Sequence, residues 1–259
     1  MIDSHCHLAD PAFADDLAEV VGRARQAGVS GGLCVLSCGN DAEEAAAGRV
    51  RALWPDLRFA VGVHPHEADR FAAGGREAGE AVREALARVP GAFAIGEIGL
   101  DYHYDLSARE AQRRVFRAQV GLARDIGLPV VVHTREADED TVAILREEGG
   151  GRVGGVFHCF SGDAALADQA LDLGFALSFA GILTFPKADA LRAVAARVPA
   201  DRLLVETDCP YLAPVPMRGR RNEPAFVART LAKLAEVRGA DAGELSAAVT
   251  ANFARLFGG

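Results

Sequence analysis

The sequence predicts a (β/α)8 barrel of the TIM type with one extra helix at the C-terminus. Eight short apolar, β-branched runs alternate with helical stretches along the 259 residues, a pattern typical of parallel βαβ units. An open doubly wound sheet is the alternative, but its first strand usually leads into a glycine-rich phosphate turn. The corresponding segment here, HLADPAF, contains no glycine. We therefore expect residues 1–259 to form a single barrel domain, since barrels of this kind often have this length.

The apolar runs and the helix start signals place the elements in order. Asp241 with Glu244, and Ser107 with Glu110, fit the capping box with which helices begin. Pro129 opens a strand, where its missing N–H is tolerated. The strands are predicted at Met1–Leu8, Gly32–Ser37, Arg58–His64, Ala92–Ile98, Pro129–His133, Gly155–Phe160, Phe175–Ala180 and Leu203–Asp208. The helices are predicted at Ala14–Ala27, Ala42–Leu53, Arg76–Arg88, Ala108–Ile126, Glu136–Glu147, Ala164–Leu171, Ala188–Arg197, Ala225–Val237 and Gly243–Phe257.

The composition narrows the class of protein. Half of the residues are hydrophobic, and the formal net charge is −8. Such a charge argues against stable binding of duplex DNA, because that binding neutralises many phosphates with Lys and Arg. The odd number of cysteines, without a CxxC pair, argues against a disulfide framework. The N-terminus lacks a signal-peptide pattern, and no run approaches the ~20 apolar residues of a membrane helix. We expect a cytoplasmic monomer that does not bind membranes.

All seven histidines fall at the ends of predicted strands or in the loops that follow. In a barrel these positions form the catalytic face. His5 and His7 are two residues apart in one strand, so both side chains point to the same side, and two imidazoles there are able to bind one cation. Cys6 points the other way and is expected to be a buried filler. Asp3, one layer deeper, either orients an imidazole or is a polar residue low in the barrel.

Two carboxylates join the histidines at the same height. Glu97 ends the fourth strand and Asp208 ends the eighth, while an ion pair at a strand end is the alternative role for each. Four imidazoles and two carboxylates are enough for two divalent ions, with one carboxylate bridging them. The predicted metal ligands are His5, His7, Glu97, His133, His158 and Asp208.

We expect one ion on His5, His7 and Asp208 with Glu97, and a second on His133 and His158 that shares Glu97. A water bound there loses its proton near neutral pH and becomes the nucleophile. Asp208 is the predicted general base, and Asp208 and Glu97 are the predicted catalytic residues. Imidazoles also accept Zn²⁺, Ni²⁺ and Mn²⁺, so the ligand set leaves the metal open.

Seven segments, DSHCHL, GVHPH, GEIGLDYH, VVVHT, FHCFSG, ETDCPYLAP and RGRRNEP, occur in this order. Together they resemble the TatD family of metal-dependent hydrolases, over essentially the whole chain. The resemblance implies the same six ligands, residue by residue, and a glutamate at position 97 fits the family pattern. It also implies a nuclease supported by Mg²⁺ or Mn²⁺, often a 3′→5′ exonuclease on single-stranded DNA and sometimes on RNA. Some relatives instead remove D-amino acids from mischarged tRNA.

Further residues are predicted to contact the substrate. His64 and His66, with Pro65 between them, are able to meet a phosphate oxygen or the leaving group. Guanidinium groups suit phosphate, although a solvated loop is the alternative role for the arginines that follow the eighth strand. Tyr102 and Tyr211 either stack on bases or pack in the core. The predicted substrate-binding residues are His64, His66, His103, Arg218, Arg220 and Arg221.

Three functions are compatible with these residues. The favoured one is hydrolysis of phosphodiester bonds at a single-stranded DNA or RNA end. The second is hydrolysis of C–N or C–O bonds in the same barrel, for example by a D-aminoacyl-tRNA deacylase. The third is a non-catalytic metal-binding scaffold, which a missing ligand would support, and no ligand is missing. A serine hydrolase is excluded because the chain has no G-x-S-x-G elbow.

Overall fold

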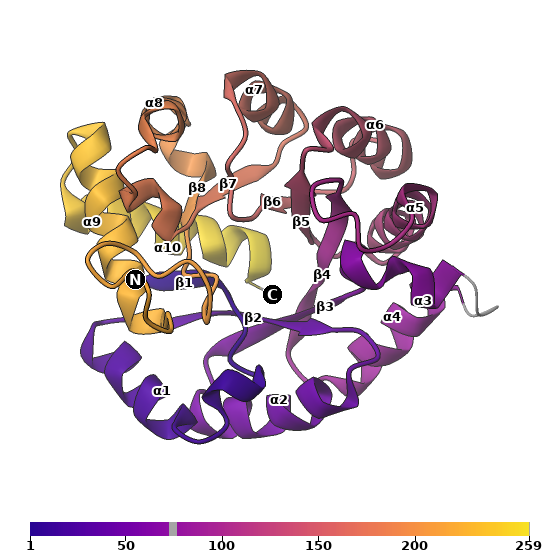
Figure 1. Ribbon diagram of the computed structural model, residues 1–259, viewed down its shortest axis with the longest axis horizontal. Helices are drawn as coiled ribbons and strands as arrows, with labels where there is room; N and C mark the ends of the chain where they lie inside the picture. The colour runs from indigo at the N-terminus through magenta and orange to yellow at the C-terminus, as the bar shows by residue number, and fades with distance from the viewer. Residues whose placement is uncertain (73–76, 259) are drawn as a thin grey trace.

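The computed structural model describes residues 1–72 and 77–258. In these residues eight parallel strands form one sheet in the order β1 to β8, and the strands curve into a ring with helices outside it (Figure 1). The ring closes through a short bridge between Cys6 and Cys209. There the backbone N–H of His7 donates to Cys209, and that of Asp208 donates to His5, each at 2.9 Å. The prediction of a TIM-type (β/α)8 barrel is confirmed.

Helices follow the strands in alternation, as predicted. The strands are β1 (Ile2–Cys6), β2 (Gly31–Ser37), β3 (Leu57–Gly62), β4 (Ala92–Asp101), β5 (Val130–Arg135), β6 (Gly155–Phe157), β7 (Ala176–Phe179) and β8 (Leu203–Val205). The helices are α1 (Leu17–Gln26), α2 (Asp41–Leu53), α3 (Ala68–Ala72), α4 (Ala78–Arg88), α5 (Arg109–Ile126), α6 (Asp138–Gly149), α7 (Ala164–Asp172), α8 (Asp189–Arg197), α9 (Val227–Arg238) and α10 (Ala242–Phe257). The predicted helix start at Arg76 lies outside the described residues.

Several strand ends differ from the prediction. β1, β6 and β8 end before His7, His158 and Asp208, so these three side chains lie in the segments that follow the strands. Asp208 has a left-handed φ of 57°, which takes the backbone out of the extended conformation. β4 and β5 are longer than predicted and continue to Asp101 and Arg135. Strand length therefore varies around the barrel mouth.

The two predicted capping boxes have different outcomes. Asp241 caps α10, because its carboxylate accepts from the backbone N–H groups of Gly243 and Glu244. Ser107 does not cap α5, which begins at Arg109 without a side-chain cap. The Ser107 hydroxyl instead donates to the carbonyl of His66 at 2.8 Å. It joins the loop after β4 to the loop after β3, beside the barrel mouth.

Two glycines let β4 approach β5 closely. A Cβ at Gly96 would lie 2.5 Å from Cβ of Val131, and a Cβ at Gly99 would lie 1.9 Å from the carbonyl oxygen of His133. Gly99 also has a φ of +147°, which side chains rarely tolerate. The segment GEIG therefore allows the close strand contact that brings Glu97 next to His133.

The extra helix α10 covers the end of the barrel opposite the histidines. The amide of Asn252 donates to the carbonyls of Ala200 (2.8 Å) and Leu203 (2.9 Å), at the amino end of β8. Phe253 and Phe257 are buried with the core. Among the described residues, no helix is both long enough and apolar enough to span a membrane.

Candidate metal centre

Glu97 lies in the middle of the barrel mouth, and imidazoles approach it from two directions. The glutamate is 7 % exposed, and its two carboxylate oxygens face different groups of side chains. We call the group at Oε2 the β1/β8 side and the group at Oε1 the β5/β6 side. Together with Glu97 itself, the two sides contain all six predicted ligands.

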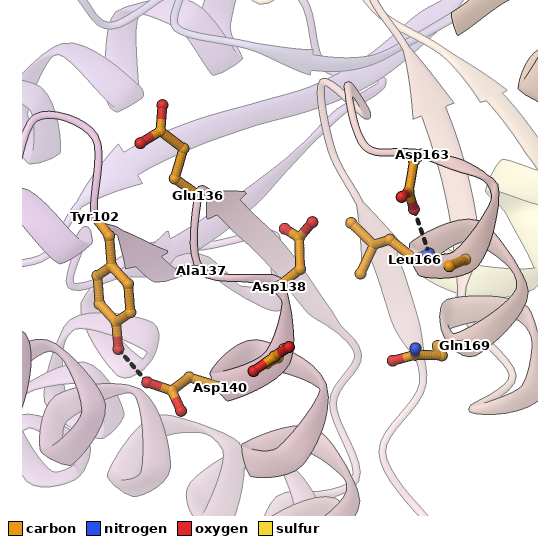
Figure 2. Close-up of a pocket in the computed structure, with 10 residues that line it drawn as sticks. Tyr102, Glu136, Ala137, Asp138, Asp140, Asp163, Leu166 and Gln169 are labelled. Atoms are coloured by element: carbon orange, nitrogen blue, oxygen red, sulfur yellow. Dashed lines mark hydrogen bonds between the residues drawn. The ribbon is translucent and has the colours of Figure 1, made fainter. Parts of the chain in front are cut away.

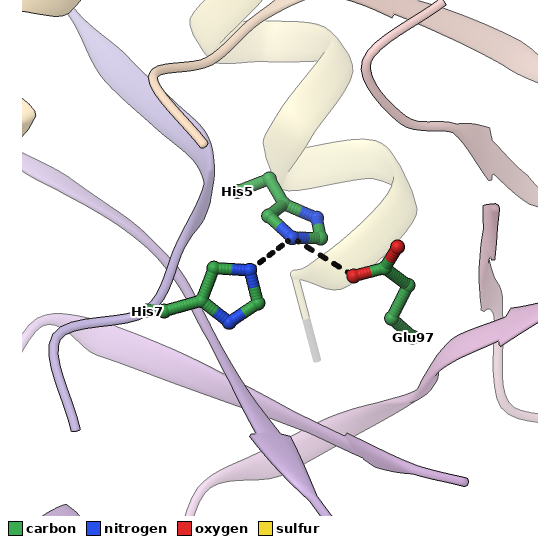
Figure 3. Close-up of side chains that lie close together, drawn as sticks. All are labelled: His5, His7 and Glu97. Carbon is green, nitrogen blue, oxygen red and sulfur yellow. Dashed lines mark hydrogen bonds and ion pairs between the residues drawn. The ribbon is translucent and has the colours of Figure 1, made fainter. Parts of the chain in front are cut away.

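The β1/β8 side consists of His5, His7 and Asp208. Nε2 of His5 lies 3.4 Å from Oε2 of Glu97 and 3.1 Å from Nε2 of His7. Oδ1 of Asp208 lies 3.7 Å from Nε2 of His5 and 3.4 Å from Nε2 of His7. Figure 3 shows His5 between His7 and Glu97. Nε2 of each imidazole is directed into the same space.

The β5/β6 side consists of His133 and His158, with His64 close by. Nδ1 of His133 and Nε2 of His158 each lie 2.7 Å from Oε1 of Glu97, and the two nitrogens are 3.4 Å apart. Nε2 of His64 lies 3.4 Å from the same oxygen. One carboxylate oxygen thus has three imidazole nitrogens around it.

The chemistry of these donors fits divalent metal ions. Imidazole nitrogens point at one another across 3.1 Å and 3.4 Å, and one shared proton at most satisfies each pair. Imidazole and carboxylate ligands suit first-row divalent metals. A cation on each side of Glu97 would satisfy lone pairs that hydrogen bonds alone leave unmatched.

Charge coupling is strong at this centre. Burial opposes ionisation of Glu97, but the imidazoles of His158 and His64 and a hydrogen bond from His133 hold its pKa well below its usual range. Burial lowers the pKa of His5, which leaves that ring neutral. Burial also acts to lower the pKa of His7, but the Asp208 carboxylate outweighs it and raises that pKa to about 9.

Asp101 supports the β5/β6 side, and the sequence analysis missed it. Its side chain is fully buried, and Oδ2 lies 3.1 Å from Nε2 of His133 and 2.9 Å from Nε2 of His66. Since a carboxylate only accepts, both Nε2 atoms carry protons, and Nδ1 is the nitrogen of His133 that faces Glu97 and is left to bind a metal ion. Carboxylates commonly hold metal-ligating imidazoles in this way. Asp101 lies on the same strand face as Glu97, four residues on, a signal that was present in the sequence.

Two deeper carboxylates have different roles. Oε1 of Glu206 lies 3.3 Å from Nδ1 of His158 and accepts from the backbone N–H of Cys159 at 2.7 Å, so it supports a predicted ligand. Asp3 does not orient an imidazole. It accepts from the hydroxyl (2.6 Å) and the N–H (2.9 Å) of Thr207, and burial raises its pKa to about 8. It joins β1 to the end of β8.

The three histidines predicted to contact substrate lie along one edge of the centre. Nδ1 of His64 accepts from the N–H of His66 at 3.2 Å, and burial lowers the pKa of His64. The neutral ring then carries its proton on Nε2, so it presents a donor to the centre. Nε2 of His66 donates to Asp101, and Nδ1 of His103 lies 2.6 Å from Oε1 of Glu136. Their contact with substrate stays a prediction.

The arginines after β8 are arranged differently from one another. The guanidinium of Arg221 is held by the carboxylate of Asp16 at 2.6 Å, and that of Arg218 lies 4.2 Å from the ring centre of Phe185. The side chain of Arg220 is exposed. A phosphate contact by one of them remains a prediction, and Arg221 is the one whose charge a carboxylate already balances.

Asn222 and Glu223, in the loop after β8, use their side chains for contacts other than capping the helical turn that follows. Asn222 donates to the carbonyls of Thr207 (2.8 Å) and Tyr211 (2.6 Å), and it thereby holds the loop against the end of β8. Glu223 binds Arg23 at 2.7 Å. Tyr211 is 55 % exposed, with its ring centre 6.1 Å from that of His7.

An open hollow lies apart from the metal centre. It has a volume of about 550 Å³ and lies between the loop after β5 and the start of α7. Figure 2 shows its carboxylates and the hydroxyl of Tyr102, which donates to Asp140 at 2.6 Å. Its acidic side chains are Glu136, Asp138, Glu139, Asp140 and Asp163. None of the six predicted ligands lines it, and its charge is unsuited to phosphate.

Known proteins resemble this chain over its full length. The family described as TatD related DNase matches residues 2–258. The chain is 38 % identical over 260 residues to the uncharacterized metal-dependent hydrolase YabD of Bacillus subtilis, covering 99 % of this chain and 98 % of that one. It is also 38 % identical over 263 residues to the 3′-5′ ssDNA/RNA exonuclease TatD of Edwardsiella piscicida, covering 99 % of each.

A solved structure supports the same assignment. The TatD homologue YJJV of Escherichia coli superposes with a TM-score of 0.88 at 32 % identity, over 99 % of this chain and 97 % of that one. The barrel, the ring of imidazoles around a shared glutamate and the match over residues 2–258 agree with one another. The chain belongs to the TatD related DNase family of metal-dependent hydrolases.

Proposed function

We propose that this protein is a two-metal 3′→5′ exonuclease that acts on the ends of single-stranded DNA or RNA. The observation that carries the proposal is the position of Glu97, whose two oxygens face two separate groups of imidazoles. A carboxylate between two such groups is the arrangement that two-metal phosphodiester hydrolases require. The exonuclease TatD of Edwardsiella piscicida supports the substrate class, since the two chains match over their full lengths.

Each side of Glu97 would hold one divalent ion. His5, His7 and Asp208 would bind on the β1/β8 side, and His133 and His158 on the β5/β6 side. When bound, such ions supply an activated water and stabilise the charge that develops on the phosphate oxygens. We propose Mg²⁺ or Mn²⁺ as the working ions, with Zn²⁺ and Ni²⁺ as alternatives that the imidazoles also accept.

The side chains of the protein would orient the substrate and move protons. Asp208 is the carboxylate at the edge of the centre, with a side chain 14 % exposed against 8 % for Glu97. It would accept the proton of the attacking water. His64 presents an N–H toward Oε1 of Glu97, 3.4 Å away, and would donate to a phosphate oxygen. Arg220 would bind a phosphate further along the strand.

The test is a single-stranded oligonucleotide labelled at its 5′ end, incubated with metal-stripped protein. Mg²⁺, Mn²⁺ and Zn²⁺ are added in separate tubes, and an Asp208→Asn protein serves as the control for contaminating nucleases. We expect a metal-dependent ladder that shortens from the 3′ end and is absent with Asp208→Asn. If no metal produces cleavage, the nuclease proposal is wrong, and mischarged aminoacyl-tRNA is the next substrate to assay.

A further inference from the structure

Four planar side chains form a continuous cluster beside the metal centre. They follow β3 and β4 or end β5, and we call them the rim cluster: His66, His103, Tyr104 and Arg135. The ring of Tyr104 lies edge-to-face against both imidazoles, with ring centres 5.7 Å from His66 and 5.0 Å from His103. The guanidinium of Arg135 lies over the same ring, 4.7 Å from its centre. Tyr104 is therefore the centre of the cluster.

Hydrogen bonds to Asp101 connect the rim cluster to the predicted metal ligand His133. Its Oδ1 accepts from the backbone N–H groups of His103 (3.0 Å) and Tyr104 (2.8 Å), which is an Asx-type turn. Its Oδ2 accepts from the rings of His66 and His133. One buried carboxylate thus sets the position of both a predicted ligand and the exposed tyrosine.

Two features of the cluster are unexplained by packing. Tyr104 is 55 % exposed, although an aromatic ring of this size is usually buried more completely. Arg135 is exposed, and among the described residues the contact of its guanidinium is with the ring of Tyr104, without an ion pair. Tyr102, two residues earlier, has the opposite environment, because its hydroxyl binds Asp140 and Arg113. From the sequence, Tyr102 was open between stacking on bases and packing in the core. Its hydroxyl is bound in the structure, and Tyr104 is the exposed ring.

The negative charge next to the rim cluster disfavours a phosphate there but not a nucleobase. The acidic hollow begins at Glu136, next to Arg135, and would repel a phosphate. A nucleobase is flat and uncharged, so it is able to lie there without that repulsion. Tyrosine rings and guanidinium planes both stack on bases, at a gain that does not depend on base identity.

We propose that the rim cluster is a stacking platform for an unpaired nucleobase next to the scissile phosphate, with Tyr104 and Arg135 as its main surfaces. This inference rests on the proposed function and adds a substrate requirement to it. A base must be unpaired to lie on the ring, so the platform would favour single-stranded ends over duplex ends.

The first test measures stacking directly. A short single strand carries 2-aminopurine at its 3′ terminus and phosphorothioate linkages that slow cleavage, and it is mixed with Mg²⁺- or Mn²⁺-loaded protein. We expect quenched 2-aminopurine fluorescence with the wild type and with Tyr104→Phe, which keeps the ring. Tyr104→Leu should lose the quenching. Leu106→Ser is the matched control, because Leu106 is an exposed apolar residue on the same segment; it should quench as the wild type does.

The second test measures turnover on an intact strand and on a strand whose two 3′-terminal sugars carry no base. The wild type should have a lower KM for the intact strand, and Tyr104→Leu should reduce that preference by about tenfold, near the low end of a stacked base. Arg135→Gln should reduce it less.

The outcomes separate the two proposals. If the wild type cleaves the strand but Tyr104→Leu quenches and discriminates as the wild type does, the platform is wrong and the nuclease function stands. If the wild type neither binds nor cleaves the strand with any metal, both proposals are wrong. Loss of cleavage in Tyr104→Leu on intact and base-free strands alike would also overturn the platform, since it would indicate a structural role.

Discussion

The two sides of Glu97 are built in different ways. On the β5/β6 side, buried carboxylates stand behind the imidazoles, Asp101 behind His133 and Glu206 beside His158. On the β1/β8 side, Nδ1 of His5 is buried without a partner. His5 and His7 are positioned by their spacing along one chain segment. Asp208 is brought beside them by the pairing of β1 with the segment after β8.

This difference predicts two binding steps of unequal strength. A carboxylate behind a ligating imidazole fixes its tautomer and increases its basicity. We therefore expect the β5/β6 side to bind its metal more tightly than the β1/β8 side. The four predictions below run from the largest expected effect to the smallest.

Glu97→Ala should weaken metal binding on both sides at once and so abolish the difference in affinity between them. Loss of the shared carboxylate removes several kcal/mol of charge stabilisation, so turnover should fall by about a thousandfold or more. The fold should persist, as measured by circular dichroism, because the barrel core does not depend on this side chain. Glu139→Ala, an exposed carboxylate in the acidic hollow, is the control. Full activity in Glu97→Ala would contradict the metal assignment.

Asp101→Asn should weaken one side only. The amide no longer accepts two charge-assisted hydrogen bonds from His133 and His66, and metal affinity on the β5/β6 side should fall by about 10- to 100-fold. Isothermal titration with Mn²⁺ should show one step shifted and the other unchanged. Asp105→Asn, on the exposed loop after β4, is the matched control. Equal shifts in both steps would mean that the two sides are not independent.

The pH dependence of metal binding should also differ between the sides. Asp208 raises the pKa of His7 to about 9, so below that pH a metal must displace a proton, and affinity rises with pH. Each displaced proton contributes about tenfold per pH unit. The pKa values of both His133 and His158 are raised by neighbouring carboxylates, which outweigh burial. The β5/β6 step should therefore release more protons.

Titration in two buffers of different protonation enthalpy measures that release. Binding without proton release at pH 7 on either side would contradict the charge coupling described for the centre.

Arg220→Ala tests whether the strand passes over the β1/β8 side. Arg220 follows β8, next to the segment that carries Asp208, and its removal should raise KM by about two- to fivefold, the size of one exposed charge contact. The melting temperature should not change. Arg221→Ala is the comparison, because Arg221 is bound to Asp16 and should affect stability more than KM. An unchanged KM in Arg220→Ala would mean that the phosphates of the strand do not pass by Arg220.

Capping signals show how far local sequence predicts structure. Asp241 caps α10 as predicted, because the nearest donors to its carboxylate are the next backbone N–H groups of its own helix. Ser107 fits the same pattern, yet its hydroxyl binds the carbonyl of His66 from another loop. Only the folded barrel places that carbonyl within reach. The same explanation applies to Asn222, which binds the carbonyls of Thr207 and Tyr211.

The sequence by itself determined the barrel and the set of side chains at its mouth. Alternating apolar runs predict parallel strands, and parallel strands in a barrel bring their carboxyl ends to one face. It also predicted that Glu97, at the end of the fourth strand, is shared between two groups of ligands, and its two carboxylate oxygens face both groups.

Only the tertiary structure decided how those side chains are supported. Asp101 binds His66, which follows β3, and His133, which lies in β5. Asp3 binds Thr207 across the seam between β1 and β8. These partners are far apart along the chain, and their distances depend on the register and twist of neighbouring strands. Local patterns carry no information about that register, so the choice between an exposed Tyr104 and a bound Tyr102 appeared only in the folded molecule.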